Sequence, residues 1–278
     1  MRAHNLHIPR PLQPYVECIR LVRYDGSGPL AINVCLNGLP GIVFQHHDGR
    51  SPVASITTRV GSLSDIPTLY VYGQMTEPGV MDHRLMPFTT IQMILKPHAL
   101  QSLLGINAAV LTNAVVDLTE FSAGDLNSRL IEAATVQDSV QLMTRFLLSR
   151  LEHYPPRDRL IEQSLHLIHR SAASITVREL LDRLHLSERQ FEKRFSQAVG
   201  VSPHFYIRIK RFNEAIRLMK TQRFATLTDV AHQLNFYDQS HFIRDIRAFS
   251  GITPKSLSQK IADIQLDQPV MAYTWSVF

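Results

Sequence analysis

A chain of 278 residues that is 45% hydrophobic and 19% charged is long and apolar enough to bury the cores of two ordinary domains. Residues 1–156 carry 11 Lys and Arg against 12 Asp and Glu, whereas residues 157–278 carry 18 against 12. This asymmetry favours a C-terminal half that binds a polyanion, although a merely basic surface explains the charge equally well. The sequence has only two cysteines, which excludes a disulfide scaffold, and no run of about 20 apolar residues, which excludes a membrane span. It also shows no secretory signal, so we expect a cytoplasmic protein.

The first hundred residues alternate short β-rich runs with turn residues. Examples are AINVCLNG (31–38), GIVFQHH (41–47) and FTTIQMILK (88–96), with Gly, Pro and Asp between the runs. Strands at this spacing predict a small barrel or sandwich, of a cupin-like kind. Val43, Phe44 and Tyr72 would line either an effector pocket or the core of this unit, and no residue identifies an effector.

Helical periodicity begins after Pro97. Thr119 and Thr135 are predicted N-caps. The apolar residues predicted to face inward are Leu126, Leu130, Val140, Met143, Phe146 and Leu147. Pro155 and Pro156 then break the pattern and mark the best domain boundary. We therefore expect an α+β chain with a regulatory domain at 1–154, an all-α domain at 155–265 and a tail at 266–278 that packs against the rest.

The all-α half contains an internal repeat. SERQFEKRFSQAVGVSP (187–203) aligns with DQSHFIRDIRAFSGITP (238–254) at an offset of 51, and the segments before them align at an offset of 50. Each copy predicts a helix, a tight turn and a second helix, at 176–200 and 227–251. Ser187 and Asp238 are predicted N-caps, Gly200 and Gly251 are predicted C-terminal stops, and Asn235 is expected in a left-handed turn.

One continuous helix is predicted between the two copies, from Pro203 to about Lys220. At about 1.5 Å per residue it would span roughly 27 Å. Successive major-groove faces on one side of B-DNA lie about 34 Å apart, so two units on such a strut could enter adjacent grooves.

The stretch from ITVRELLDRLHL to GITPKSL (175–257) resembles the DNA-binding domain of AraC/XylS-family transcription regulators, including its signature in the form NFYDQSHFIRDIRAFSGITP. The preceding half is similar to the family's N-terminal regulatory domain around QMILKPHALQSLLG. The sequence departs from the family where His185 and Asn235 replace a usual turn glycine and Leu181 replaces a usual alanine. The resemblance implies a regulator that inserts two helices into adjacent major grooves, modulated through its N-terminal domain by an effector or by dimerisation.

The resemblance also implies which side chains meet DNA. The residues carried over as base contacts are Arg189, Glu192 and Lys193 in the first unit, and Gln239, Ser240, His241 and Arg244 in the second. Their chemistry fits, because Arg and Lys address guanine, Gln pairs with adenine and Glu accepts from cytosine. Residues expected at phosphates, at helix caps or in local ion pairs are Ser187, Asp238, Arg194, Lys210, Arg217 and Arg247. For any one of these residues a solvated helix face is the alternative.

Other functions receive less support from the sequence. The sets with metal-ligand chemistry are His46, His47 and Asp48, and Glu162, His166 and His169, and neither has a fourth ligand or a CxxC motif. We therefore expect no metal, no cofactor and no catalytic residue. The alternatives left open are a DNA-architectural protein with weak sequence preference and a cupin-like enzyme fused to a DNA-binding module. Besides double-stranded DNA, the candidate partners are RNA polymerase, a small-molecule effector and a second copy of the chain.

Overall fold

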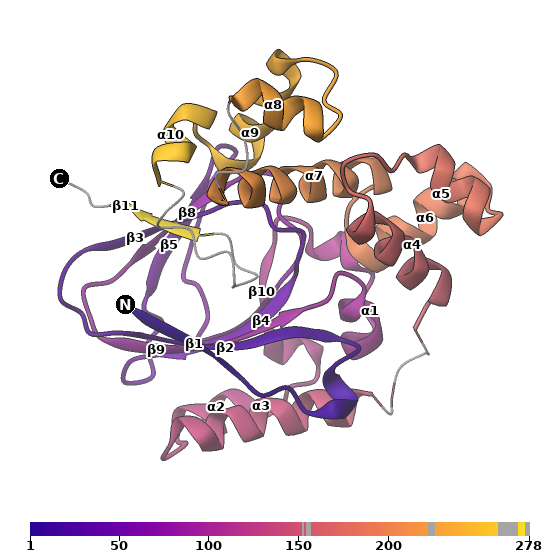
Figure 1. The fold of residues 1–278 in the computed structure, drawn as a ribbon. Helices are drawn as coiled ribbons and strands as arrows, with labels where there is room; N and C mark the ends of the chain where they lie inside the picture. The colour runs from indigo at the N-terminus through magenta and orange to yellow at the C-terminus, as the bar shows by residue number, and fades with distance from the viewer. Residues whose placement is uncertain (152, 154–156, 222–225, 261–271, 276–278) are drawn as a thin grey trace.

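Two antiparallel sheets build the N-terminal half of the protein, and helices build the C-terminal half (Figure 1). The computed structural model describes residues 1–151, 153, 157–221, 226–260 and 272–275. The predicted two-domain α+β architecture is confirmed. The boundary predicted at 154/155 and the predicted end of the second domain at 265 lie outside the described residues.

All strand pairings in the two sheets are antiparallel. The first sheet has the order β1 (Arg2–Leu6), β2 (Val16–Tyr24), β9 (Phe88–Leu95), β4 (Gly41–His46), β7 (Leu69–Tyr72) and β10 (Val115–Asp117). The second has the order β11 (Ala272–Trp275), β3 (Leu30–Val34), β8 (Gly79–His83), β5 (Val53–Thr58) and β6 (Ser62–Ser64). Residues 272–275 thus return to the N-terminal domain and pair with β3.

Alternation along the central strands gives each sheet two different faces. On β4, Ile42 and Phe44 pack toward the helices that follow the sheet region. Val43 lies in a separate buried cluster with Val53 and Ile56 of the second sheet. The first sheet is therefore covered by helices on one face and by the second sheet on the other, as a sandwich requires.

The α-helices that cover the first sheet follow its strand β9 in the chain. They are α1 (Ala99–Leu104), α2 (Leu126–Ile131) and α3 (Val136–Arg150), with short 3-10 turns η1 (Arg10–Leu12), η2 (Ala108–Leu111) and η3 (Leu118–Phe121). Thr135 caps α3 in a reciprocal capping box with Asp138, as predicted. The prediction for Thr119 is wrong, because the Asp117 carboxylate caps η3 and accepts from the backbone N–H of Thr119.

The C-terminal helices contain both predicted helix-turn-helix units. They are α4 (Arg159–Arg170), α5 (Val177–Leu184), α6 (Glu188–Val199), α7 (Pro203–Lys220), α8 (Leu227–Gln233), α9 (Gln239–Ser250) and α10 (Pro254–Lys260). His185 and Asn235 occupy equivalent turn positions, each with a φ of 52°. Gly200 and Gly251 end α6 and α9 at φ values of 97° and 79°. The repeat in the sequence is therefore a repeat in backbone conformation.

Helix α7 joins the two units, as predicted. Ser202 caps it by accepting from the N–H of Phe205, and Pro203 occupies its first turn. Tyr206 and Ile207 belong to the core of the first unit, whereas Phe212 and Ile216 belong to the core of the second. Both units are thus built onto one 18-residue helix.

Candidate nucleic-acid interface

Helix α6 separates its apolar and polar residues onto two faces. Ser187 caps the helix by accepting from the N–H of Gln190, as predicted. Phe191 and Phe195 are fully buried, at 0% exposure. The predicted base contacts Arg189 and Lys193 are exposed, and Glu192 is half-buried. Side chains that can donate and accept hydrogen bonds therefore occupy the face that the apolar residues leave free.

Helix α9 repeats this arrangement. The Asp238 carboxylate caps it by accepting from the N–H of His241 at 2.6 Å, as predicted. Phe242, Ile246 and Phe249 are buried. The predicted base contacts that are exposed on the free face are Gln239, Ser240 and Arg244. We refer to α6 and α9 as the reading helices.

The fourth predicted contact on α9, His241, is only half exposed. Its ring meets that of Phe236 edge-on, with centroids 5.5 Å apart, and its Nε2 lies 3.8 Å from Oδ2 of Asp245. Asp245 is 2% exposed and accepts a 2.6 Å hydrogen bond from Arg208 of α7. The His241 side chain therefore packs against Phe236 and Asp245, and the outward polar face consists mainly of the other three side chains.

Two arginines predicted at phosphates or in ion pairs form ion pairs. Arg194 binds Asp158 through both Nε and Nη2, at 2.7–2.9 Å, and Asp158 also caps α4. Arg217 donates from Nε to Glu214 at 2.9 Å. Arg247 of α9 is exposed and takes part in neither of these two ion pairs. Of the three side chains, Arg247 is therefore the best placed to meet a phosphate.

Lys210 does not have the position expected of a phosphate contact. Its Nζ donates to the carbonyl of Asn37 at 3.0 Å and lies 5.1 Å from the centre of the Tyr206 ring. Burial lowers the pKa of Lys210 to about 8, partly offset by the negative charge of Glu17. Lys210 is therefore part of the contact between the two domains, which its place on a basic helix did not indicate.

A loop of the N-terminal domain enters the core of the second unit. Cys35 and Leu36, which follow β3, are 2% and 1% exposed and belong to the same cluster as Phe212 and Phe249. The carbonyl of the next residue, Asn37, accepts from both Lys210 and Asn213. The second helix-turn-helix unit is therefore completed by residues more than 150 positions earlier in the chain.

Both reading helices contact the N-terminal domain at their C-terminal ends. At the end of α6, the carbonyl of Gly200 accepts from Thr112 Oγ1 at 2.6 Å. At the end of α9, the carbonyl of Phe249 accepts from the N–H of Leu36 at 3.1 Å. A change in the N-terminal domain can therefore reach both reading helices.

The sequence interpretation missed one exposed aromatic residue beside α9. Tyr237 directly precedes the N-cap Asp238, and 92% of it is exposed. The change of repeat offset from 50 to 51 locates one extra residue at this turn, and that signal could have identified it. An exposed tyrosine at the start of a reading helix brings a hydroxyl and an aromatic face to the outward surface.

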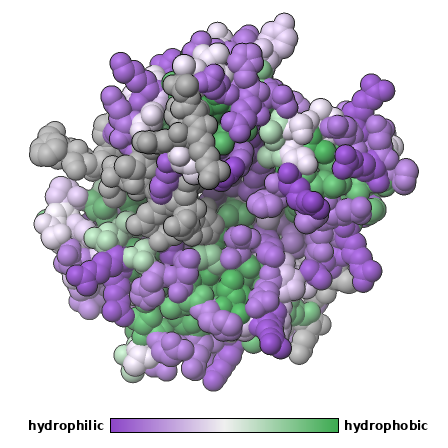
Figure 2. Space-filling view, in the orientation of Figure 1, coloured by the Kyte–Doolittle hydropathy of each residue, from purple (hydrophilic) through white to green (hydrophobic). Residues whose placement is uncertain are grey.

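The surface over the C-terminal helices is mostly hydrophilic in the view of Figure 2, whereas hydrophobic surface gathers over the sheets and the helices below them. None of the helices in the described part of the chain combines the length and apolar character needed to cross a bilayer. Among the described residues, no three His, Cys, Asp or Glu side chains form a group that could hold a metal ion.

Two family models match separate parts of the chain. A model described as a helix-turn-helix domain matches residues 180–260, and a model described as a domain of unknown function (DUF6597) matches residues 6–117. The probable transcriptional regulator LumQ of Photobacterium leiognathi is 33% identical over 97 residues. That match covers 35% of this chain and 36% of LumQ, so the chain aligns with about a third of its relative's length.

Two solved structures also align with parts of this chain. ToxT of Vibrio cholerae aligns with 87% of this chain and 97% of its own, at 14% identity and a TM-score of 0.46. A xylose-binding transcription activator, xylR, aligns with 44% of this chain and 38% of its own, at 19% identity and a TM-score of 0.33.

Proposed function

We propose that the protein is a sequence-specific DNA-binding transcription regulator of the AraC type, because a helix-turn-helix family model matches residues 180–260 and a probable transcriptional regulator is 33% identical over 97 residues. The proposal assigns α6 and α9 to two neighbouring major grooves of one duplex. It assigns α7 the role of the strut that fixes their spacing.

One observation carries the proposal: the same exposed polar face occurs at equivalent positions of two repeated units on one helix. A solvated surface has no reason to repeat donors and acceptors in register with buried apolar pairs, Phe191 and Phe195 in α6 and Phe242 and Ile246 in α9, whereas groove recognition does. The C-terminal location of the basic excess supports the same conclusion, because phosphate neutralisation supplies much of the affinity for DNA.

The exposed side chains differ in which base edges they can bind. In α6, Arg189 and Lys193 suit guanine O6 and N7, and Glu192 suits the amino group of cytosine. In α9, Arg244 suits guanine and Gln239 suits adenine, with Ser240 able to bond either kind of base. We assign His241 the smallest contribution to base recognition, because its Nε2 already lies 3.8 Å from Asp245.

Tyr237 extends the interface at the start of α9. Its exposure supports a contact to a sugar–phosphate oxygen through the hydroxyl, or to a thymine methyl through the ring. The pair Tyr237→Phe and Tyr237→Ala separates the two. Loss in both variants indicates the hydroxyl, and loss in the alanine variant alone indicates the ring.

The test is genome-wide footprinting of the purified full-length protein, followed by binding measurements on the recovered site. Arg244→Ala and Lys193→Ala should each weaken binding by about 1–3 kcal/mol and relax the preference at one base pair. Arg145→Ala is the matched control, because Arg145 is exposed on α3 of the N-terminal domain and its removal changes the net charge equally. Unchanged site and affinity in both α6 and α9 variants would contradict the proposal.

The two alternatives predict different results in the same experiment. A DNA-architectural protein binds all duplexes with one affinity, and its salt dependence accounts for nearly all of that affinity. An enzyme tethered to DNA would turn over a substrate in its N-terminal domain, and a metal-dependent one would contain metal when purified. Metal analysis of the purified protein addresses that case.

The proposal gives the N-terminal domain a regulatory role, through an effector or a second copy of the chain. Support comes from its contacts with the ends of both reading helices, at Gly200 and Phe249. A ligand would act by binding one arrangement of these contacts more tightly than another. RNA polymerase belongs to the proposal if the protein activates, and a promoter reporter distinguishes activation from repression.

A further inference from the structure

The two reading helices carry opposite charges at one equivalent position. Asp245 of α9 lies 51 positions after Arg194 of α6, which is the offset of the repeat. Each directly follows an exposed cation of the free face, Lys193 in α6 and Arg244 in α9. Each also forms an ion pair with a residue outside its own helix. Both reading helices are therefore anchored at the same position of the repeat, by different partners.

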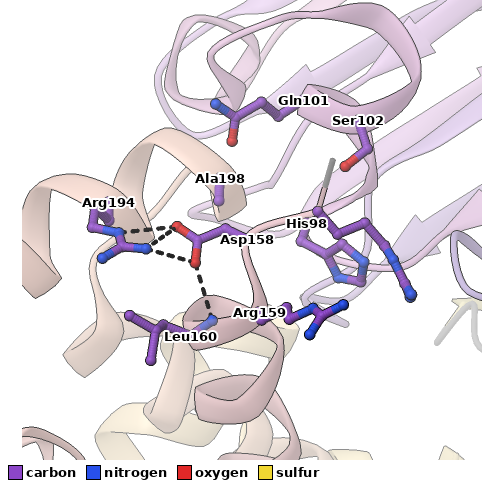
Figure 3. A pocket seen from close by; sticks show the side chains of 9 residues that line it. His98, Gln101, Ser102, Asp158, Arg159, Leu160, Arg194 and Ala198 are labelled. Carbon is purple, nitrogen blue, oxygen red and sulfur yellow. Dashed lines mark hydrogen bonds and ion pairs between the residues drawn. The ribbon is translucent and has the colours of Figure 1, made fainter. Parts of the chain in front are cut away.

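In the first unit, Arg194 joins α6 to the start of α4. Its Nε and Nη2 donate to the carboxylate of Asp158 at 2.7–2.9 Å (Figure 3). Asp158 also accepts from the backbone N–H of Leu160 at 3.1 Å, so its carboxylate is itself fixed as the N-cap of α4. The pair lines a pocket of about 440 Å³ that α1 and the start of α4 share, so it lies where the two domains meet.

In the second unit, Asp245 joins α9 to α7. Asp245 is 2% exposed and accepts from Nη2 of Arg208 at 2.6 Å and from Nε at 3.3 Å. The same guanidinium lies over the rings of Phe249 and Phe205, with its Cζ 5.2 and 5.8 Å from their centres. Phe249 belongs to α9 and Phe205 to α7. Arg208 therefore contacts both helices through one flat, bidentate group.

These ion pairs restrict a motion that apolar packing restricts less. Hydrophobic contacts have no preferred direction, and packed helices in other proteins shift against each other by about 1–2 Å. Two parallel N–H donors on a carboxylate allow a much narrower range of orientations. A helix with its side chains has a radius of about 5–6 Å, so a turn of about 20° about its axis moves a side-chain end by roughly 2 Å. A shift of that size breaks a hydrogen bond to a base edge.

Stability is the weaker explanation of the buried pair in the second unit. Removing two charges from water costs free energy that their attraction has to offset, and an apolar pair of similar volume often stabilises a protein as well or better. What the ion pair adds over an apolar pair is fixed geometry. The equivalent position of the first unit keeps an ion pair although its charge is opposite. The feature that the two units share is therefore the pair and not the residue.

We propose that the ion pairs Arg194–Asp158 and Arg208–Asp245 are positioning devices that fix the rotation of α6 and α9 about their axes. The fixed rotation sets which base edges each free face meets and the spacing of the two half-sites. Fixing the helices is independent of the proposed function, whereas the effect on half-site spacing rests on that function.

Arg208→Lys tests the second pair, because lysine keeps the charge but lacks the planar, bidentate group. Binding is measured on the site recovered by footprinting and on copies with one base pair added or removed between the half-sites. Each such change moves one half-site by about 3.4 Å and should weaken wild-type binding about tenfold, as a mismatched base pair typically does. In Arg208→Lys this loss should shrink to roughly threefold. A role in stability alone would weaken binding to all copies equally and leave the tenfold loss unchanged.

Other variants provide the controls. Arg194→Lys should shrink the same loss through the first pair. Arg129→Lys is the matched control, because Arg129 pairs with Asp125 at 3.8 Å in the N-terminal domain, and it should leave the tenfold loss unchanged. If Arg208→Lys does not fold, Arg208→Met combined with Asp245→Leu removes both charges together and should give the same smaller loss.

Distances between spin labels test the positioning without DNA. Labels on Arg189→Cys and Ala248→Cys occupy exposed positions of α6 and α9, and the native cysteines are buried. We expect the distribution of distances between the labels to widen in Arg194→Lys and in Arg208→Lys. In Arg129→Lys it should match the distribution of the labelled protein without a lysine substitution.

Two results would overturn the proposal: an unchanged distance distribution in both paired-arginine variants, or an unchanged tenfold loss on the respaced copies. A wild-type protein that binds every duplex equally would contradict the proposed function instead. The distances alone would then decide whether the ion pairs fix the helices.

Discussion

Leu36→Ala should destabilise the second helix-turn-helix unit, although Leu36 belongs to the N-terminal half of the chain. The side chain is 1% exposed and packs in the cluster that includes Phe212, Phe249 and Leu257. Truncating a buried leucine removes its transfer free energy and leaves a cavity, for a total of about 2–5 kcal/mol. With a value of about 3 kcal/mol, the equilibrium for opening this region rises by roughly two orders of magnitude.

Hydrogen exchange of the full-length protein, followed by mass spectrometry, measures this opening. Backbone amides of α8 and α9 should exchange faster by about that factor in Leu36→Ala, provided their exchange goes through this opening. Leu39→Ala is the control, because Leu39 lies in the same loop but is only half-buried and outside the cluster. If α8 and α9 keep their protection and only the strands lose theirs, then Leu36 does not contribute to the core of the second helix-turn-helix unit.

Three further predictions concern the turns and the contact between the domains. His185→Gly should raise the free energy of unfolding, measured by urea denaturation, by about 1 kcal/mol, because a left-handed φ of 52° strains a non-glycine residue. Asn235→Gly should change it less, because asparagine tolerates this conformation and its Nδ2 donates to the carbonyl of Ala173. Lys210 has a pKa of about 8 in the folded protein against an ordinary value of 10.5, so the unfolded state holds its proton to higher pH and stability increases as pH rises through 8. The free energy of unfolding should therefore gain about 1 kcal/mol between pH 7 and pH 9 relative to Lys210→Met, and equal slopes would contradict the assignment. Gly200→Ala and Gly251→Ala should each lower the free energy of unfolding by about 1 kcal/mol, because both glycines have positive φ values. Only Gly200→Ala should also increase hydrogen exchange in η2, because its new Cβ would lie 3.1 Å from the Ala108 carbonyl oxygen. The new Cβ at Gly251 would meet nothing closer than 3.5 Å.

Features of the C-terminal half that depend on neighbouring residues could be predicted from the sequence. The N-caps Ser187 and Asp238, the glycines after α6 and α9, and the left-handed Asn235 follow from side-chain and backbone chemistry within one turn. The free faces of the reading helices follow from the spacing of buried phenylalanines. The prediction for Thr119 is wrong for an equally local reason, since Asp117 two residues earlier is the stronger cap.

Features that depend on distant residues could not be predicted. AINVCLNG has the pattern of one apolar strand, but β3 ends at Val34, and Cys35 and Leu36 pack in the helix-turn-helix domain. An apolar residue shows that burial is needed and does not show which partner provides it. Lys210 and Arg194 illustrate the same limit, because a cation on a basic helix has the same appearance in the sequence whether it meets solvent, phosphate or a carbonyl far away in the chain.

The two reading helices are held by the N-terminal domain in unequal ways. At the second unit, Cys35 and Leu36 share a buried cluster with residues of α7, α8 and α9, which adds hydrophobic stabilisation to the hydrogen bond at Phe249. At the first unit, the cluster of buried residues in the described chain contains none from the N-terminal domain.

The contact at the first unit includes the packing of α6 against α1 and η2, the close approach at Gly200 and the Thr112 hydrogen bond, and the interdomain pocket lies next to the same helix. A ligand in that pocket would therefore act on the first unit, by binding one arrangement of these contacts more tightly than another. We expect regulation to alter the groove contacts of α6 while α9 stays fixed, so an effector should change footprinting protection at the half of the site that Lys193→Ala affects and leave the Arg244 half unchanged.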